Sequence, residues 1–350
     1  MSGPNSASSC DLKTHGDATA SMKVIVIGAG SIGERHIRAF RRINGIAVSL
    51  VEPRPERAQQ IAARYGCESS YGSIEAAPLG SFDAAVIATP ANSHLPIGIA
   101  CASRGLHLLI EKPLAASIEG IEKLIALCES KRLVAAVGYT LRFDPTIVKL
   151  RKLVQCGLAG PLISLRSVCT HYLPNSRPDY KEAYYRVPNA AAGVILDLSH
   201  ELNYLEWIFG DLTVEACRRA RVPDLNIADE AVADIWLRRS DGPLAQIHLH
   251  AADKHLSREC YVVGTEASLT ANILTGEILV EGGRRAGEQI KCASERDETH
   301  LDEARDFIDA IREKRSPRCT IEEALRTLQV SLEAMKAPMV EATALDNSVS

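Results

Sequence analysis

Three side chains in this 350-residue chain have types and settings suited to proton transfer: Lys112, Asp197 and His200. Lys112 follows an apolar run at residues 106–110 by two positions and precedes a proline. A lysine at the end of a buried strand holds its ammonium beside a crevice, where it can polarise a substrate hydroxyl or carbonyl oxygen. The competing interpretation is an ordinary surface lysine in a loop.

Asp197, His200 and Glu201 are spaced i, i+3 and i+4 within residues 194–209, which the apolar pattern predicts to be one helix. Side chains at this spacing share a helical face. The set is compatible with metal binding, but it also suits an enzyme that removes a proton from an alcohol, because histidine works near neutral pH. A salt-bridged surface helix is the alternative.

A second constellation lies near the start, where an apolar run beginning at Lys23 stops at Gly28, Gly30 and Gly33. This GxGxxG spacing permits a sharp turn, a close approach of a diphosphate to the backbone, and tight packing of the next helix. A helix predicted over residues 32–43 directs its first amides at the anion, so Ser31 and Ile32 join the glycines as cofactor-binding candidates.

Glu52 stands nineteen residues after Gly33, at the end of a strand predicted over residues 47–51. An acidic residue at this place binds the ribose hydroxyls of an adenosine and repels a 2′-phosphate, so the sequence predicts NAD as the cofactor. Arg54 and Arg57 follow and can soften that preference, which leaves NADP possible.

Helices and strands alternate from Glu52 to about residue 138, which predicts a doubly wound parallel sheet. The carboxyl ends of its strands meet at one crevice. Polar segments that follow predicted strands should therefore converge on the nicotinamide half of the cofactor: Thr89 and Pro90 with His94, Glu111 with Lys112, and Tyr139.

Four segments together resemble the glucose-fructose oxidoreductase, inositol dehydrogenase and MocA family: residues 28–33, 88–94, 111–115 and 138–143. The resemblance implies an N-terminal Rossmann domain and a C-terminal α+β domain with an open, mostly antiparallel sheet. It also implies hydride transfer between NAD(P) and a secondary alcohol or ketone of a sugar, nucleotide sugar or cyclitol, and a homodimer or homotetramer formed through the C-terminal sheet. A dinucleotide-binding sensor that lacks turnover is the alternative.

The resemblance assigns roles to particular residues. His200 is the expected proton acceptor, Asp197 orients it, and Lys112 stabilises charge on the substrate oxygen. The expected cofactor-binding residues are Gly28, Gly30, Ser31, Ile32, Gly33, Glu52, Thr89, Pro90, His94, Glu111 and Lys112, and the expected substrate-binding residues are Tyr139, Arg142, Arg177 and Tyr180.

The sequence departs from the family pattern around these residues. Ala191 and Ala192 stand where many members have glycines, Asn203 replaces an aspartate, and Thr140 replaces an asparagine. Asp197 and His200 are three residues apart, whereas four is usual in the family. The shorter spacing leaves Tyr139 as an alternative proton carrier.

Residues 172–186 form a polar, aromatic loop that is long for a plain connection. Its tyrosines suit sugar faces or bases, and Arg177, Lys181 and Arg186 suit a carboxylate or a diphosphate. The loop is typical of a subgroup acting on nucleotide-linked or N-acylated sugars, although an oligomer contact is an equal alternative.

Domain boundaries follow from the same patterns. Residues 1–21 predict a disordered tail, residues 22–142 the NAD-binding domain, and residues 143–345 a domain for substrate binding and oligomerisation. Strands are predicted at residues 161–173, 212–220, 231–237, 244–250, 260–263, 268–273 and 277–280, and a helix that begins with the capping box Thr320–Glu323.

Composition excludes several classes of protein. A formal net charge of −4 without a basic stripe argues against a nucleic-acid partner, and no apolar run is long enough to span a membrane. Ten scattered cysteines indicate a reducing cytoplasm rather than disulfides or a zinc site. His248 and His250 share a strand face without a nearby third ligand, so no metal is expected.

Overall fold

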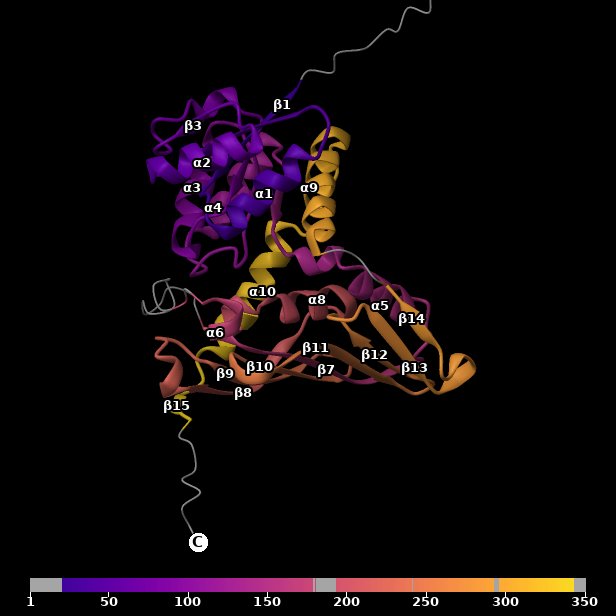
Figure 1. Ribbon diagram of the computed structural model, residues 1–350. Helices are drawn as coiled ribbons and strands as arrows, with labels where there is room; N and C mark the ends of the chain where they lie inside the picture. The colour runs from indigo at the N-terminus through magenta and orange to yellow at the C-terminus, as the bar shows by residue number, and fades with distance from the viewer. Residues whose placement is uncertain (1–20, 179, 181–192, 241, 293–295, 343–350) are drawn as a thin grey trace, which may run out of the picture.

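The computed structural model describes residues 21–178, 180, 193–240, 242–292 and 296–342, which form two domains stacked on one another (Figure 1). The tail expected at residues 1–21 lies almost entirely outside these residues. So do Ala191, Ala192, Lys181, Arg186 and the rest of the loop beyond Tyr180.

The first domain contains a parallel sheet with the strand order β3-β2-β1-β4-β5-β6. Its central strands are continuous apolar runs because helices cover both faces. The order reverses between β1 and β4, and this switch point opens the ligand crevice expected of a doubly wound fold. The strands are β1 (Met22–Ile27), β2 (Ile46–Val51), β3 (Ser70–Tyr71), β4 (Ala84–Ile87), β5 (His107–Ile110) and β6 (Ala135–Val137).

The helices of this domain agree with the sequence pattern except at their ends. The sequence predicts a helix from Ser117, but it begins at Ile121, because Gly120 has a φ of +81° and cannot continue a right-handed helix. The four helices are α1 (Ser31–Arg41), α2 (Pro55–Tyr65), α3 (Ala91–Ser103) and α4 (Ile121–Lys131).

The second domain is built on a mixed, mostly antiparallel sheet with the order β14-β13-β12-β11-β7-β10-β9-β8-β15 among the described residues. β11 is far longer than the predicted 260–263, because polar residues interrupt its alternation while its backbone still pairs with β7. The strands are β7 (Leu162–Tyr172), β8 (Thr213–Arg221), β9 (Val232–Arg238), β10 (Leu244–His250), β11 (Ala252–Gly264), β12 (Ser268–Asn272), β13 (Glu277–Glu281), β14 (Gln289–Lys291) and β15 (Met339–Glu341).

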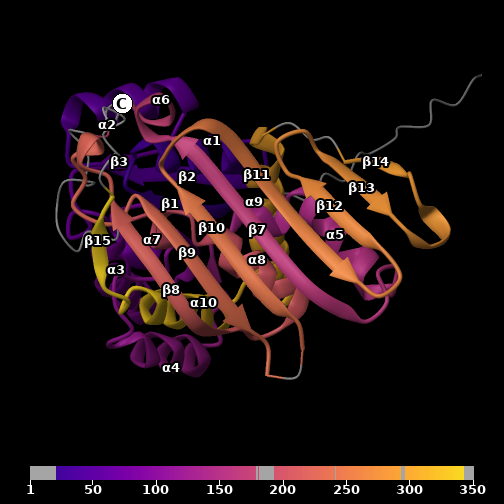
Figure 2. The same ribbon diagram turned by 90° about the horizontal axis from the view of Figure 1, so that it is seen from below.

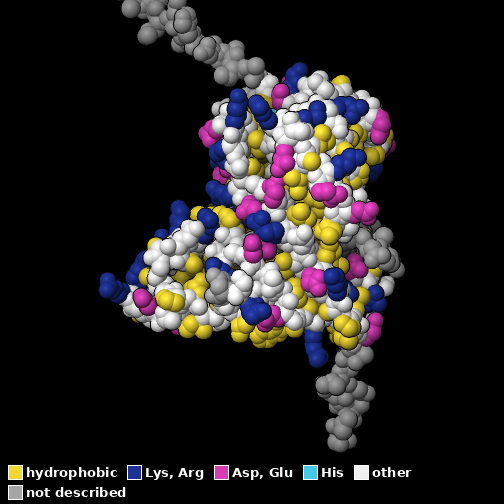
Figure 3. Space-filling view, turned by 180° about the vertical axis from the view of Figure 1, so that it is seen from behind, with side chains coloured by type: hydrophobic (Ala, Val, Ile, Leu, Met, Phe, Trp, Pro, Cys, Tyr) yellow, Lys and Arg dark blue, Asp and Glu magenta, His cyan; other side chains and the backbone are white. Residues whose placement is uncertain are grey.

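Helices cover only one face of this sheet. Figure 2 shows the other face bare, with β8, β9, β10, β7 and β11 in front of the helices. Seen from behind, hydrophobic side chains gather along the lower margin of this domain (Figure 3). The helices of the covered face are α5 (Pro145–Gln155), α6 (Leu173–Ser176), α7 (Val194–Asp197), α8 (His200–Phe209) and α10 (Ile321–Ala334).

Helix α9 (Arg296–Glu313) comes late in the chain but packs against the first domain. Phe307 meets Phe40 of α1 edge to face with ring centroids 6.3 Å apart, and Ala304 and Ile308 are also buried in that core. The next helix, α10, begins with the predicted capping box formed by Thr320 and Glu323. The first domain is therefore completed by a helix that follows most of the second domain in the chain.

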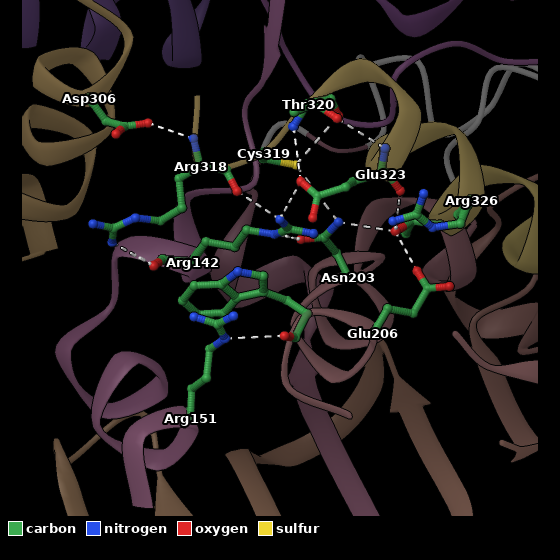
Figure 4. A network of polar contacts seen from close by, with 12 residues as sticks. Arg142, Arg151, Asn203, Glu206, Asp306, Arg318, Cys319, Thr320, Glu323 and Arg326 are labelled. Carbon is green, nitrogen blue, oxygen red and sulfur yellow. Dashed lines mark hydrogen bonds and ion pairs between the residues drawn. The ribbon is translucent and has the colours of Figure 1, made fainter. Parts of the chain in front are cut away.

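A buried arginine, Arg142, joins the two domains (Figure 4). Its side chain is 2% exposed and donates to Asn203 Oδ1 of α8, to the Arg318 carbonyl oxygen and to Glu323 Oε2 of α10, each at 2.8 Å. Buried charges are costly unless they are paired in this way, so the network fixes how the domains are joined.

Glu206 lies at the end of the same network, where its Oε2 accepts from Thr327 Oγ1 at 2.6 Å. Burial raises the pKa of this carboxyl to about 7, against the lowering effect of the Thr327 hydrogen bond. Between pH 4.5 and about 7 the Glu206 carboxyl is therefore protonated in the folded protein and ionised in the unfolded chain.

This linkage predicts that Glu206 lowers stability as pH rises through that interval. Glu206→Gln keeps an acceptor for Thr327 and removes the charge, so the variant should gain about 3 kcal/mol over wild type at pH 8 and almost none at pH 4.5. Urea unfolding at several pH values measures the difference. Glu333→Gln, at an exposed position of α10, should keep the wild-type pH dependence, and an identical slope in both variants would contradict the prediction.

Candidate functional site

The glycine turn between β1 and α1 has the geometry that a diphosphate site requires. Gly28 has a φ of +92°, and a Cβ there would lie 2.6 Å from the Ala88 carbonyl oxygen. A Cβ at Gly33 would lie 1.9 Å from the Gly28 carbonyl oxygen, so α1 could not pack this closely with any other residue. At Gly30 a Cβ meets no described atom within 4 Å, which leaves open space before the helix amides of Ser31 and Ile32.

Glu52 ends β2 at the rim of this turn and is 3% exposed. Its Oε2 accepts from the Ala29 amide at 3.2 Å, and Arg54 contacts both carboxylate oxygens at 2.7 and 3.0 Å. The Arg54 hydrogen bond lowers the pKa of Glu52 despite burial, so the carboxylate is ionised. The residues present therefore fit an adenosine ribose beside the diphosphate turn.

His94 supports the crevice through the backbone. Its Nδ1 lies 2.9 Å from the Pro113 carbonyl oxygen and its Nε2 lies 2.7 Å from the Thr89 carbonyl oxygen. Burial lowers the pKa of this imidazole, although both carbonyls oppose that shift. His94 thus ties the segment after β4, which includes Thr89 and Pro90, to the loop that carries Lys112.

Lys112 and Asp197 meet across the two domains. Lys112 Nζ donates to the Asp197 carbonyl oxygen at 2.5 Å and to its carboxylate Oδ1 at 3.2 Å. Both side chains are largely buried, at 16% and 12% exposed. In such surroundings the ammonium interacts with nearby charge more strongly than it does in water.

The predicted single helix over residues 194–209 is wrong. α7 ends at Asp197, Leu198 and Ser199 form a turn, and α8 begins at His200. Asp197 and His200 therefore occupy the end of one helix and the start of the next, not one helical face. Asp197 contacts Lys112 from the last residue of α7.

The buried Glu230 holds α7 in place, a feature that sequence reasoning missed. Its Oε1 accepts from the Ile195 amide at 3.2 Å, and its Oε2 binds Arg219 at 3.1 Å. Gly193 makes this possible, because a Cβ there would lie 2.2 Å from Glu230 Oε1. A glycine directly before the Asp–His segment was the available signal.

His200 and Tyr139 lie in edge-to-face contact with ring centroids 5.6 Å apart. Burial, together with the charges of Lys112 and Arg258, holds the pKa of His200 well below its usual value, so the imidazole is neutral and able to accept a proton. Burial raises the pKa of Tyr139 far above its usual value, and its hydroxyl lies 3.3 Å from Ser199 Oγ. At neutral pH the His200 imidazole is therefore uncharged and the Tyr139 hydroxyl keeps its proton.

Three substrate-binding candidates remain, and only Arg177 lies beside the cluster of Lys112, Asp197 and His200. Arg177 lies 4.0 Å from Asp197 Oδ1 and is half exposed, so it stands at the mouth of this cluster. Tyr180 is buried in the core of the second domain, and its amide donates to the Arg177 carbonyl oxygen at 3.0 Å. Arg142 faces protein acceptors in the network described above rather than this cluster.

Two further groups near the cluster were missed by sequence reasoning. His171, near the end of β7, has its pKa lowered by burial and is subject to the opposing charges of Asp197 and Arg177. Arg258 of β11 forms a two-point ion pair with the buried Glu201 at 2.6 and 3.0 Å. No sequence motif marks either group, because β7 and β11 meet only in the folded sheet.

The described residues contain no group of three or more histidine, cysteine, aspartate or glutamate side chains arranged to hold a metal ion. His248 Nδ1 instead lies 2.8 Å from Asp234 Oδ1, and His250 Nδ1 accepts from the Ala252 amide at 3.0 Å. Within the same described ranges, no helix combines the length and apolar character needed to cross a membrane.

A dinucleotide turn, a buried lysine–aspartate pair and a neutral histidine at one crevice are features of an NAD(P)-binding oxidoreductase. Family models agree: residues 22–139 match the oxidoreductase family with an NAD-binding Rossmann fold, and residues 147–270 match the C-terminal domain of the same family. The chain belongs to the glucose-fructose oxidoreductase, inositol dehydrogenase and MocA family of NAD-binding oxidoreductases.

Individual relatives agree with this assignment. Inositol 2-dehydrogenase of Leifsonia xyli is 33% identical over 71% of each chain, and UDP-N-acetylglucosamine 3-dehydrogenase of Acidithiobacillus ferrooxidans is 27% identical over 90% of this chain and 97% of its own. An Agrobacterium radiobacter oxidoreductase, crystallised with NAD⁺, L-tartaric acid and magnesium, shares the fold with a TM-score of 0.81 at 19% identity, covering 91% of this chain and 96% of its own. Several other relatives are matched over only 40 to 58% of their length.

The geometry at Glu52 predicts its effect on cofactor choice. Glu52→Ala removes the ribose acceptor and frees Arg54, so the Kd for NAD should rise about tenfold while that for NADP stays the same or falls. Fluorescence titration with NADH and with NADPH measures the Kd for the reduced form of each cofactor, and the two values are compared between variant and wild type. Glu56→Ala, an exposed carboxylate four residues away, should leave the ratio unchanged. Equal weakening of both cofactors by Glu52→Ala would refute the ribose role.

Proposed function

We propose that this protein is an NAD-dependent dehydrogenase or reductase acting on a secondary alcohol or ketone of a sugar, nucleotide sugar or cyclitol. The observation that carries the proposal is the contact of Lys112 with Asp197 beside the neutral His200, at the carboxyl end of the strands whose first turn fits a diphosphate. A sensor that only binds a dinucleotide has no need of this acid–base set.

Each residue has a definite part in the proposed reaction. Bound NAD would supply the hydride acceptor or donor. Lys112 donates a hydrogen bond to the substrate oxygen and stabilises negative charge on it, which makes the hydroxyl proton easier to remove. His200 accepts that proton, while Asp197 holds the ammonium of Lys112 in place.

The class of substrate rests on the names of relatives and on charge at the mouth of the site. The two relatives described above act on inositol and on UDP-N-acetylglucosamine, as their names state. Arg177 beside Asp197 offers a guanidinium for a carboxylate or a diphosphate. We therefore include nucleotide sugars and sugar acids among the substrates to be tested.

In the first experiment the purified protein is mixed with NAD or NADP and with one compound at a time from a panel of sugars, inositols, sugar acids and nucleotide sugars. The absorbance of the nicotinamide reports turnover. Lys112→Met and His200→Ala should each lower kcat at least about 100-fold and leave the Kd for NAD nearly unchanged, because both variants keep the glycine turn and Glu52, which we expect to hold the diphosphate and the ribose. Lys123→Met, at an exposed position of α4, is the matched control and should retain wild-type turnover.

Two results would contradict the proposal. Undiminished turnover in both variants would remove the assigned acid–base roles. Tight binding of NAD with no turnover of any compound would instead favour the regulatory, non-catalytic interpretation of the same fold.

The bare face of the second sheet is proposed to join copies of the chain into a homodimer or homotetramer. Large apolar side chains on this face are solvent exposed in the single chain: Trp236 at 48%, Leu244 at 51% and Tyr261 at 38%. Tyr261 also lines a hollow of about 380 Å³ on this face, together with Arg166, His248 and Glu259. We place the protein in the cytoplasm, in keeping with nine unpaired cysteines in the described part of the chain.

The oligomer is testable by mass. Trp236→Arg should put a charge in the apolar contact and convert the assembly to a monomer, as measured by light scattering. Leu274→Arg, at an exposed apolar residue in the turn after β12, is the control and should leave the mass unchanged. A wild-type monomer, or a Trp236→Arg variant of unaltered mass, would contradict this interface.

A further inference from the structure

A buried histidine–carboxylate pair lies behind the catalytic lysine. His36, on α1, is completely buried, and its Nε2 lies 2.6 Å from Glu111 Oε1. Glu111 is 6% exposed and is the residue immediately before Lys112. The pair therefore connects the helix that begins at the glycine turn with the loop that carries the lysine.

The second oxygen of Glu111 fixes the start of that loop. Its Oε2 accepts from the Lys112 amide at 3.0 Å. Gly138 leaves room for the carboxylate, because a Cβ there would lie 3.1 Å from Glu111 Oε1. Contacts from α1, from the Lys112 backbone and from the end of β6 thus set the orientation of one carboxylate.

The buried atoms indicate which nitrogen of His36 donates. His36 Nδ1 is buried without a hydrogen-bond partner among the described residues, so the proton is assigned to Nε2, which faces the carboxylate. Burial alone would raise the pKa of Glu111, but the hydrogen bond from His36 and the nearby charge of Lys112 bring it below its usual value. Glu111 is therefore ionised and can accept from both donors.

We propose that His36 is a positioning residue for Lys112, which it holds through the Glu111 carboxylate, and that it thereby links the dinucleotide-binding helix to the acid–base site. The proposal rests on the function proposed above for Lys112. A histidine that only filled space in the core would need no carboxylate partner. His36 instead donates its Nε2 proton to Glu111, the carboxylate that accepts from the Lys112 amide.

Two substitutions separate positioning from packing. His36→Leu removes the donor and keeps an apolar side chain, whereas His36→Gln carries an amide nitrogen that can reach the same carboxylate. We expect kcat to fall at least about tenfold in His36→Leu, with KM for the substrate and Kd for NAD within about threefold, and to recover largely in His36→Gln.

His107→Leu is the matched control, because His107 Nδ1 accepts from the Val134 amide at 2.8 Å in the same sheet but does not contact the lysine loop. It should lower the thermal midpoint and leave kcat unchanged. If His36→Leu and His107→Leu lower stability alike and neither changes kcat, or if His36→Gln fails to recover turnover, the positioning role is overturned.

A second measurement needs no turnover. The rate at which acetic anhydride modifies Lys112, followed by peptide mass mapping, reports how the ammonium is held against Asp197. His36→Leu should speed modification about threefold or more, while His36→Gln and His107→Leu should match wild type. An unchanged rate in His36→Leu would overturn the proposal. Faster modification in a protein that turns over no substrate would uphold the positioning and refute only the proposed function.

Discussion

The contact between Lys112 and Asp197 is the interaction on which the site depends, because its two members come from different domains. Each end has its own support. Glu111 fixes the backbone of the lysine, and Glu230 holds the helix that ends at the aspartate. An ammonium has three N–H donors, so one that binds a carbonyl and a carboxylate still has a donor to offer a substrate oxygen.

Similar logic governs the Arg142 network, in which one guanidinium binds an amide, a carbonyl and a carboxylate from later parts of the chain. Removing a single partner would leave a buried charge uncompensated, which costs far more than the net value of the pair. The hydrogen bonds and the ion pair of Arg142 therefore hold the domain junction together with the apolar packing of α10. They also fix the position of the two domains on either side of the crevice.

Sequence alone predicted the parts whose physics is local. Gly28 and Gly33 indicate a sharp turn and a close approach of the helix to the strand, because only glycine fits there. The apolar runs of β1, β2 and β4 indicate a sheet covered on both faces. The capping box at Thr320 likewise fixed the start of α10. Family resemblance carried the fold class and the pairing of Lys112 with the Asp–His segment.

What sequence could not give depends on contacts between distant residues. The break at Leu198 has no counterpart in the helical pattern of the sequence, and Glu230, which holds α7, lies 35 positions after its partner Ile195. The resemblance made Arg142 an expected substrate-binding residue, and only the fold showed that its three acceptors belong to the protein itself. No sequence pattern marks His36 either, because its partner Glu111 lies 75 residues later in the chain.

The late position of α9 has a consequence for how the protein is made. Ile37 and Phe40 of α1 pack in one core with Ala304, Phe307 and Ile308, which leave the ribosome after most of the second sheet. Vectorial synthesis usually lets an N-terminal domain fold first. Here the nascent cofactor domain carries an open apolar flank until α9 has emerged, so a chain that ends before α9 would leave the core of its N-terminal domain incomplete.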